Sequence, residues 1–213
     1  MLKRLAHLLF GDYGLYRIYA CITTAVQPPE HDRAVRIAAL DSITPLLHTP
    51  WESLRGLVPY GGEGAWLYGA WLGAELAAVA CYWNPQRYAA RGFLTLMPDE
   101  AKLVQLTTAE PYRGRGLATL LVRYSASDLR RHGPRRLLAR IWHNHHASSR
   151  ALEQAGWVQI ARIVELHPLG MRPALRLRWR VDPMTPADPH VRPESPLPPS
   201  TEPRPQRRAP GPG

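Results

Sequence analysis

Residues 106–118 read LTTAEPYRGRGLA, a strand-like run that passes through two glycines into a helix-like run. After the second glycine, apolar residues recur at the spacing of one helix face: Leu117, Leu120, Leu121 and Tyr124. This spacing predicts a helix over residues 116–132, which Gly133 and Pro134 end. The segment therefore predicts a strand, a tight turn and a helix in direct succession.

The turn has the composition of an anion site. The first N–H groups of a helix have no partner within it, and the helix dipole adds positive potential there. Gly114 and Gly116 lack a Cβ, so a phosphate can approach the backbone, and Arg113 and Arg115 add guanidinium groups that suit phosphate oxygens. The nucleotide P-loop and the three-glycine dinucleotide fingerprint are both missing. A pyrophosphate is the expected guest, and the alternative is a glycine turn before an ordinary helix.

The flanking sequence alternates strand and helix patterns. Strands are predicted over residues 35–40, 65–71, 76–83, 102–108, 137–142, 157–166 and 175–181. Two short helices are predicted between residues 41 and 57, and another over residues 148–155, which Gly156 closes. In the last strand apolar residues alternate with arginines, which predicts a half-buried strand with a basic outer face.

Both ends of the chain differ from its middle. Residues 1–30 are expected to be a helical appendage, because Leu2, Leu5 and Leu8 share one helical face. One interpretation of residues 1–10 is a helix that makes weak contact with a membrane surface or a partner. The other is a helix that packs against its own domain. Eleven of the 31 residues in 183–213 are proline, so this segment is expected to be a disordered tail. The tail either has no binding role or is an extended ligand for a partner that recognises proline. The domain proper is then residues 31–182.

The chain is strongly basic, with a net charge of +10 and a pI near 10.2, and so it attracts phosphate-rich cofactors, nucleic acid or anionic lipid. No apolar run approaches the ~20 residues of a membrane span, and no secretory signal is evident. Cys21 and Cys81 have no metal-ligand spacing and are expected to be reduced and buried. We therefore expect a cytoplasmic protein.

Two motifs carry a resemblance to a known family. Residues 113–118 resemble the Gln/Arg-x-x-Gly-x-Gly/Ala signature of the GNAT superfamily of N-acetyltransferases. Residues 148–157 read SSRALEQAGW and are similar to the family's next motif, in which a helix ends in Gly-Phe before a long strand; here Trp157 replaces Phe. The motifs occur in the family's order, and the resemblance extends over residues 34–181.

The resemblance implies an α+β (α/β) fold with a mixed, splayed central sheet of about six to seven strands flanked by helices. It implies a transferase that moves an acetyl group from acetyl-CoA, bound in the gap of the sheet, to a primary amine of a small molecule or a protein. The implied cofactor contacts are backbone groups of Leu106, Thr107 and Thr108 at the pantetheine arm, amides of Arg113, Gly114, Arg115, Gly116, Leu117 and Ala118 at the pyrophosphate, and Asn144 and Ser148 at the far side of the arm.

Two positions depart from the family pattern. His145 stands where the family often has Asn, with Asn144 one place earlier. Leu152 stands where many members carry a Tyr that protonates the leaving thiolate, so another group must serve or the donor is missing. Glu100 and His145 are the candidates for the general base. The alternative is that Glu100 is a solvated carboxylate at the start of a strand and His145 an exposed loop histidine without a catalytic role.

Three functions compete at this level. The first is an active acetyltransferase, and the second is a CoA-binding or regulatory module without catalysis, which Leu152 favours. The third is a basic polyanion-binding protein, although no nucleic-acid module is recognisable and no specific nucleic-acid partner is expected. His143, His145 and His146 lack an accompanying carboxylate or cysteine, so no metal is expected. The first helices and segments 51–64 and 84–98 are expected to build the acceptor pocket. The acceptor and the oligomeric state are not predicted.

Overall fold

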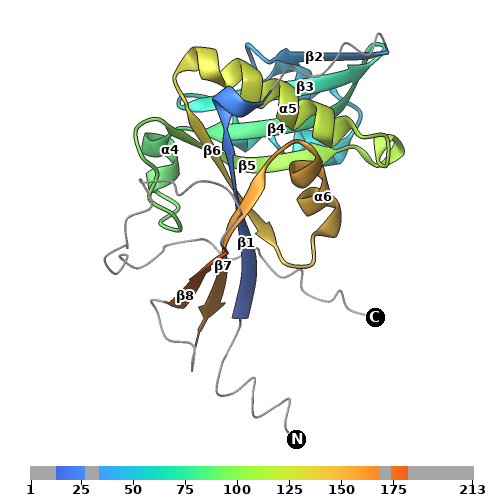
Figure 1. Cartoon of the computed structure of the whole chain (residues 1–213). Helices are drawn as coiled ribbons and strands as arrows, with labels where there is room; N and C mark the ends of the chain where they lie inside the picture. The colour runs from blue at the N-terminus through green and yellow to red at the C-terminus, as the bar shows by residue number, and fades with distance from the viewer. Residues whose placement is uncertain (1–12, 27–33, 168–173, 182–213) are drawn as a thin grey trace, which may run out of the picture.

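The computed structural model describes residues 13–26, 34–167 and 174–181, which form one eight-stranded sheet with helices on both faces (Figure 1). The sheet order is β2-β3-β4-β5-β6-β1-β7-β8. The strands are β1 (Tyr13–Ile22), β2 (Val35–Ala39), β3 (Ala65–Leu72), β4 (Glu75–Trp83), β5 (Glu100–Thr108), β6 (Arg136–Trp142), β7 (Val158–Leu166) and β8 (Leu175–Arg180). All neighbouring strands are antiparallel except β5 and β6, so the predicted mixed sheet is confirmed.

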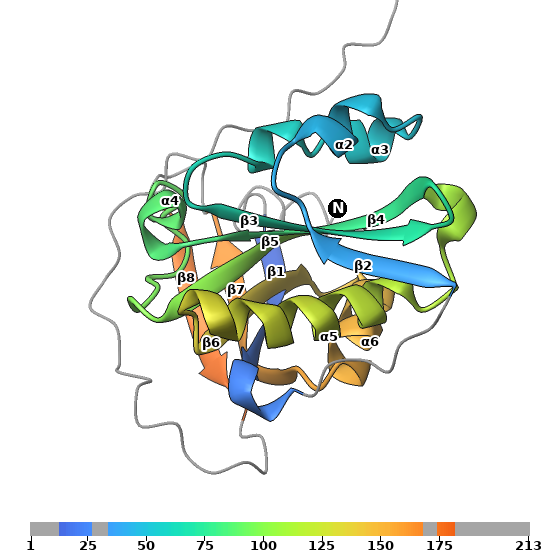
Figure 2. The same ribbon diagram turned by 90° about the horizontal axis from the view of Figure 1, so that it is seen from above.

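The helices divide between the two faces of the sheet. They are α2 (Thr44–His48), α3 (Glu52–Arg55), α4 (Pro85–Ala89), α5 (Leu117–Leu129) and α6 (His146–Gln154). Figure 2 shows α5 and α6 on one face and α2 and α3 on the other. The apolar stripe of α5 is fully buried at Leu121, Val122 and Leu129, against buried residues of β4 and β5. This packing holds the glycine turn, which precedes α5, against the end of β5.

Strand β1 overturns the expectation of a helical appendage for the part of residues 1–30 that the structure describes. It lies inside the sheet, antiparallel to both β6 and β7. Ile18 and Tyr19 are almost completely buried in it, and the Tyr19 hydroxyl donates a 2.7 Å hydrogen bond to Glu153 on α6. This strand accounts for the eighth strand, one more than the upper count expected. Residues 1–12 and the proposed tail 183–213 lie outside the described residues.

Strand β8 forms where it was predicted, but its burial is not as predicted. It is an edge strand, and its apolar residues Leu175, Leu177 and Trp179 are between 42 and 52% exposed. The arginine side is partly covered instead, because Arg176 pairs with the buried Glu165 at 2.8 Å. The apolar alternation was correct, but no described element covers that face.

Candidate active site

The sheet opens between β5 and β6. These strands pair in parallel over four residue pairs, from Glu100 opposite Arg136 to Leu103 opposite Ala139. Residues 104–108 of β5 and 140–142 of β6 then diverge, while β5 stays paired to β4 as far as Thr108. One edge of residues 104–108 therefore has no strand beside it, so an extended ligand can lie there as an added strand.

A bulge marks the point where the strands separate. Cys81 of β4 lies opposite Gln105 and Tyr82 lies opposite Leu103, so Val104 is the extra residue of β5. A bulge interrupts the ladder and redirects the backbone locally. The bulge therefore lies where β5 leaves β6 and the opening begins.

The predicted anion loop follows β5 after one 3₁₀ turn (Glu110–Tyr112), and its residues 113–116 are exposed. Gly114 and Gly116 adopt φ of 76° and 73°, a left-handed conformation that glycine tolerates best, and a Cβ at either position would point into open space. Gly116 is the N-cap of α5, without a side-chain cap, and the first helical bond runs from the Leu120 N–H to the Gly116 carbonyl. The amides before Leu120 are thus left for an anion. The side chains of Arg113 and Arg115 lie on the same exposed loop, as expected.

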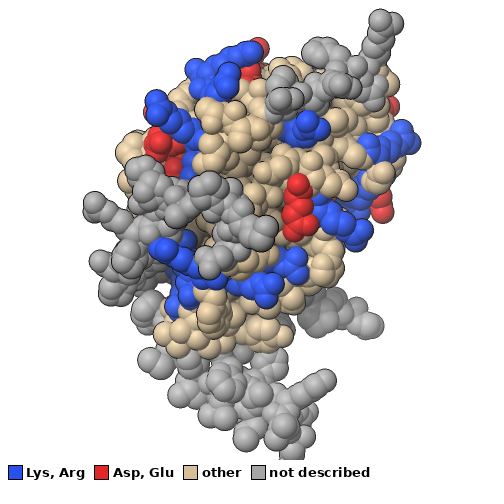
Figure 3. All heavy atoms as spheres, viewed as in Figure 1, with Lys and Arg blue, Asp and Glu red and all other residues tan. Residues whose placement is uncertain are grey.

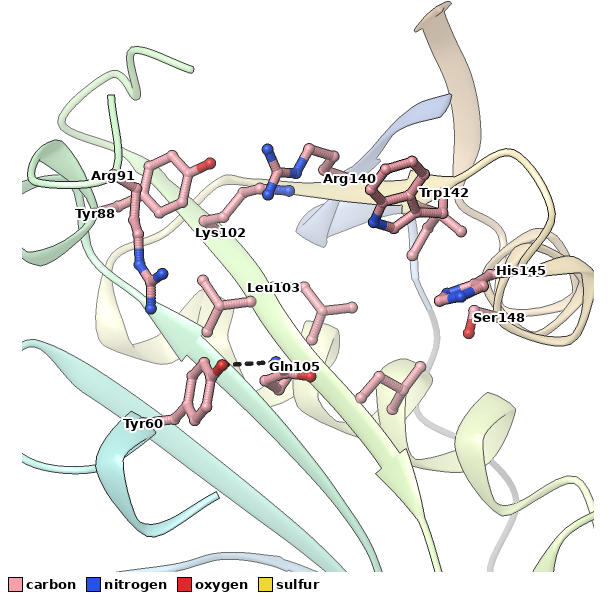
Figure 4. A pocket seen from close by; sticks show the side chains of 13 residues that line it. Tyr60, Tyr88, Arg91, Lys102, Leu103, Gln105, Arg140, Trp142, His145 and Ser148 are labelled. Carbon is pink, nitrogen blue, oxygen red and sulfur yellow. Dashed lines mark hydrogen bonds between the residues drawn. The ribbon is translucent and has the colours of Figure 1, made fainter. Parts of the chain in front are cut away.

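A cavity of about 360 Å³ lies in the opening, in the range of small-molecule sites (Figure 4). Its walls come from β5, β6, α4, the segment before β3 and the start of α6: Tyr60, Tyr88, Arg91, Lys102, Leu103, Val104, Gln105, Leu106, Arg140, Ile141, Trp142, His145 and Ser148. The Gln105 amide donates a 2.8 Å hydrogen bond to the Tyr60 hydroxyl, which ties the turn Val58–Tyr60 to β5.

A family model described as the acetyltransferase (GNAT) family matches residues 32–157, well over half of the chain. This chain belongs to the acetyltransferase (GNAT) family. The match contains the free edge of β5, the glycine loop and helix α6, whereas β1 precedes it. A comparison with curated protein sequences finds no match.

Solved structures support the GNAT fold. A GCN5-related N-acetyltransferase from Sphaerobacter thermophilus is similar with a TM-score of 0.54 and 13% identity over 85% of this chain. A tandem GNAT protein from the clavulanic acid biosynthesis pathway has a TM-score of 0.53 and 14% identity over 86% of this chain. A GNAT-family acetyltransferase from Colwellia psychrerythraea has a TM-score of 0.50 and 19% identity over 78%. This chain spans only 56 to 60% of the length of those three chains.

The GNAT site brings together some of the residues expected from the sequence. Leu106, His145 and Ser148 line the cavity, and Figure 4 shows His145 and Ser148 together at the α6 end. Thr107 and Thr108 lie on the free edge of β5. Asn144 is exposed in the turn before α6 and does not line the cavity. Helix α6 starts at His146, two residues earlier than predicted, with His145 as its N-cap.

Glu100 does not reach this cavity. It lies at the closed end of the β5–β6 pair, where its Oε1 accepts a 3.0 Å bond from Arg136 and its Oε2 accepts a 2.8 Å bond from the Met97 N–H. Its side chain is only 6% exposed. The geometry therefore gives Glu100 a structural role at the start of β5 and disfavours it as the general base.

The sequence did not point to the charged residues of the cavity. Lys102, Arg140 and Arg91 come from β5, β6 and the end of the α4 region, and no spacing rule connects them. Arg91 and Tyr88 do fall within segment 84–98, which was expected to build the acceptor pocket. Of the aromatic residues in segment 51–64, Tyr60 lines the cavity and Trp51 does not.

Leu152 lies on α6, and its side chain is completely buried in the core. It is not among the residues that line the cavity. Tyr60 and Tyr88 are the hydroxyl-bearing aromatic residues that line it. The site thus lacks the usual family donor at that position and presents other phenols in the same cavity.

Charge and hydropathy on the rest of the described surface bear on the other functions considered. On the face shown in Figure 3, Lys and Arg outnumber Asp and Glu but lie in separate groups rather than one stripe. Within the described residues, no helix combines the length and apolar character that crossing a bilayer requires. The same part of the chain holds no group of three His, Cys, Asp or Glu side chains placed to bind a metal ion.

Proposed function

We propose that this protein transfers an acetyl group from acetyl-CoA to a primary amine, without a covalent enzyme intermediate. The observation that carries the proposal is the free edge of β5, residues 104–108, which leads through one 3₁₀ turn (Glu110–Tyr112) into the glycine loop that precedes α5. That continuity offers hydrogen-bonding groups for a pantetheine arm and, at its end, bare amides for a pyrophosphate.

The residues of the site have separable roles in this reaction. The amides of residues 114–118 hold the pyrophosphate, and residues 106–108 hold the arm so that the thioester lies beside the Val104 bulge. The amine nitrogen attacks the carbonyl carbon, the carbon–sulfur bond breaks, and the thiolate leaves with the electron pair. Positioning of this kind contributes several kcal/mol, roughly 7–11 in favourable cases. His145, at the cavity wall, is the proposed proton acceptor, directly or through water.

The test is a direct assay with the purified chain. CoA release from acetyl-CoA is followed with a thiol reagent across a panel of primary amines, and acetylated products are verified by mass spectrometry. Saturable turnover with at least one amine supports the proposal, provided that a Gly116→Glu variant abolishes it. Failure to bind acetyl-CoA in a calorimetric titration would overturn it.

A non-catalytic CoA-binding module is the second candidate, because Leu152 is buried in the core where many family members carry the proton donor. Tight CoA binding with no transfer to any amine, even at pH values where the amines are unprotonated, would establish this second function instead. The two candidates share the cofactor site and differ only in turnover.

A further inference from the structure

A second cavity, of about 780 Å³, lies at the closed end of the β5–β6 pair. Its walls come from the end of β1, the segment before β5, and the turn that joins α5 to β6. It shares no lining residue with the cavity in the opening of the sheet, and the proposed acetyl transfer does not use it. Its volume lies in the range of small-molecule sites. The structure therefore offers a second place for a ligand.

Arginines dominate the wall of this second cavity. Residues 130–136 read RRHGPRR, and the chain turns at Gly133, which has a φ of 111°. Arginines from both sides of this turn line the cavity: Arg130, Arg131, Arg135 and Arg136. The acidic residues on the wall are Asp99 and Glu100. The wall therefore carries four guanidinium groups and two carboxylates.

The acidic residues near the cavity leave two of these arginines without a partner. The other two have carboxylate partners at 3.0 and 3.5 Å: Arg136 with Glu100, and Arg131 with Asp128. Within the described residues, neither Arg130 nor Arg135 has a hydrogen bond, an ion pair or a ring contact through its side chain. The helix dipole favours a cation at Arg130, the C-cap of α5, but does not account for Arg135, which follows the turn. Both residues are exposed, so their guanidinium groups are available to a ligand in the cavity.

Apolar side chains lie on the same wall. Ile22, at the end of β1, and Met97, before β5, line the cavity and are each 46% exposed. Such residues beside guanidinium groups suit a ligand that carries an apolar part as well as an anion. A carboxylate has two oxygens, which a single guanidinium group occupies in a bidentate pair. A terminal phosphate has three oxygens and can accept hydrogen bonds from both unpartnered arginines.

This cavity is separate from the proposed pyrophosphate site. The glycine loop precedes α5, whereas the arginines lie at and beyond its end. The 13 residues of α5 correspond to about 20 Å at ~1.5 Å per residue. Figure 1 shows α5 running across the sheet between the two ends. A pyrophosphate held in the glycine loop therefore does not reach these arginines.

We propose that this second cavity binds a small phosphate ester. Arg130 and Arg135 hold the phosphate, and Arg131, whose side chain is 77% exposed, adds to the positive potential that attracts it. Ile22 and Met97 pack against the apolar part of the molecule. A nucleotide such as ADP has both a phosphate and a flat base that can lie on apolar side chains. The arginines gather around one cavity rather than along a stripe, which favours a small molecule over a nucleic-acid strand.

Calorimetric titration of ADP into CoA-saturated protein tests the site, because CoA then occupies the glycine loop. We expect one ADP to bind, and Arg130→Gln and Arg135→Gln each to weaken this binding about tenfold. Arg162→Gln removes the same charge at an exposed position outside the cavity and should keep the affinity of the parent. Met97→Gln should weaken ADP binding about threefold and leave the binding of ribose 5-phosphate, which has no base, unchanged.

Other results would overturn the inference. Equal weakening of ADP binding by Arg130→Gln and Arg162→Gln would mean that ADP responds only to the net charge of the protein. Binding that Gly116→Glu abolishes and Arg130→Gln leaves intact would place ADP in the glycine loop. No ADP binding, or binding of a short single-stranded RNA in its place, would also contradict the site. Acetyl transfer to an amine can succeed or fail without changing any of these results, so the two proposals are tested separately.

Discussion

The hydroxyl groups of Tyr82 and Ser125 lie 2.7 Å apart, and their hydrogen bond joins the middle of strand β4 to helix α5 inside the core. The Ser125 hydroxyl is also 3.3 Å from the Val122 carbonyl, to which it can donate, so the Tyr82 hydroxyl is assigned as the donor to Ser125. Both residues are completely buried. This bond fixes the helix that carries the anion loop against the strand next to β5.

Removing the Tyr82 hydroxyl should weaken this link. Tyr82→Phe deletes the donor and leaves the buried Ser125 oxygen with one partner fewer, which costs about 1 kcal/mol in the free energy of unfolding. Urea unfolding followed by circular dichroism measures the loss. Tyr13→Phe, at a residue that is 62% exposed, should leave the stability unchanged. Equal stability of Tyr82→Phe and the parent would show that the bond contributes nothing.

Gly116 should be essential for the cofactor. Gly116→Glu places a carboxylate over the amides of the loop and forces a non-glycine residue to φ of 73°, so CoA affinity should fall at least tenfold. Gly133→Glu is the matched control, because Gly133 also has a positive φ but lies beyond the far end of the 13-residue α5 and the short turn Arg130–His132, at least about 20 Å away. Both variants lose stability, whereas only Gly116→Glu should lose CoA binding in a calorimetric titration.

Glu100 and His145 should differ in what their loss changes. Glu100→Gln breaks the buried pair with Arg136 and should cost about 2 kcal/mol of stability, with kcat within about threefold of the parent. His145→Ala should lower kcat by about 10²-fold with little effect on stability, because His145 is exposed at the cavity wall. Chemical denaturation and steady-state kinetics on both variants decide the assignment. A large loss of kcat in Glu100→Gln would restore Glu100 as a candidate base.

Lys102 should make stability depend on pH in a defined direction. Its pKa in the folded protein lies below the ordinary 10.5, so between these two values the unfolded chain binds more protons. The free energy of unfolding of the parent therefore increases as pH rises toward 10.5. Lys102→Met lacks this dependence and should be more stable than the parent below that window, with the advantage shrinking as pH approaches 10.5.

Paired urea unfolding experiments from pH 6 to pH 10 measure this difference. The other titratable or charged groups that line the cavity are present in both proteins and cancel in the comparison: Tyr60, Tyr88, Arg91, Arg140 and His145. A difference that does not change with pH would mean that Lys102 is not forced toward its neutral form by its surroundings.

Local signals in the sequence predicted the strand, the glycine loop and the helix that follows it. The two loop glycines, the helical spacing that follows them and Gly156 after α6 each reflect a backbone requirement within a few residues. Such requirements do not depend on the rest of the fold, which is why the strand–turn–helix unit and the ends of most strands agree with the structure.

The remaining features depend on distant partners. Strand β1 reads as part of an appendage until β6 and β7 are seen on either side of it. The exposure of Trp179 depends on whether another element covers that face of β8. The alternation of apolar residues along a single strand does not contain this information. Lys102 and Arg140 are neighbours only because β5 and β6 pair at this end before they diverge. Two basic residues brought together in this way cannot be found by a search for motifs along the chain.

The placement of β1 also sets an order of events during biosynthesis. The ribosome releases Tyr13–Ile22 before Arg136–Trp142 and Val158–Leu166, the strands on either side of it, have been translated. At ~5–20 residues per second this delay is on the order of 10 s. Throughout that interval the apolar residues of β1 have no partner strand and are accessible to chaperones and to other nascent chains. Strand β1 is therefore made before its partner strands but becomes native only after them.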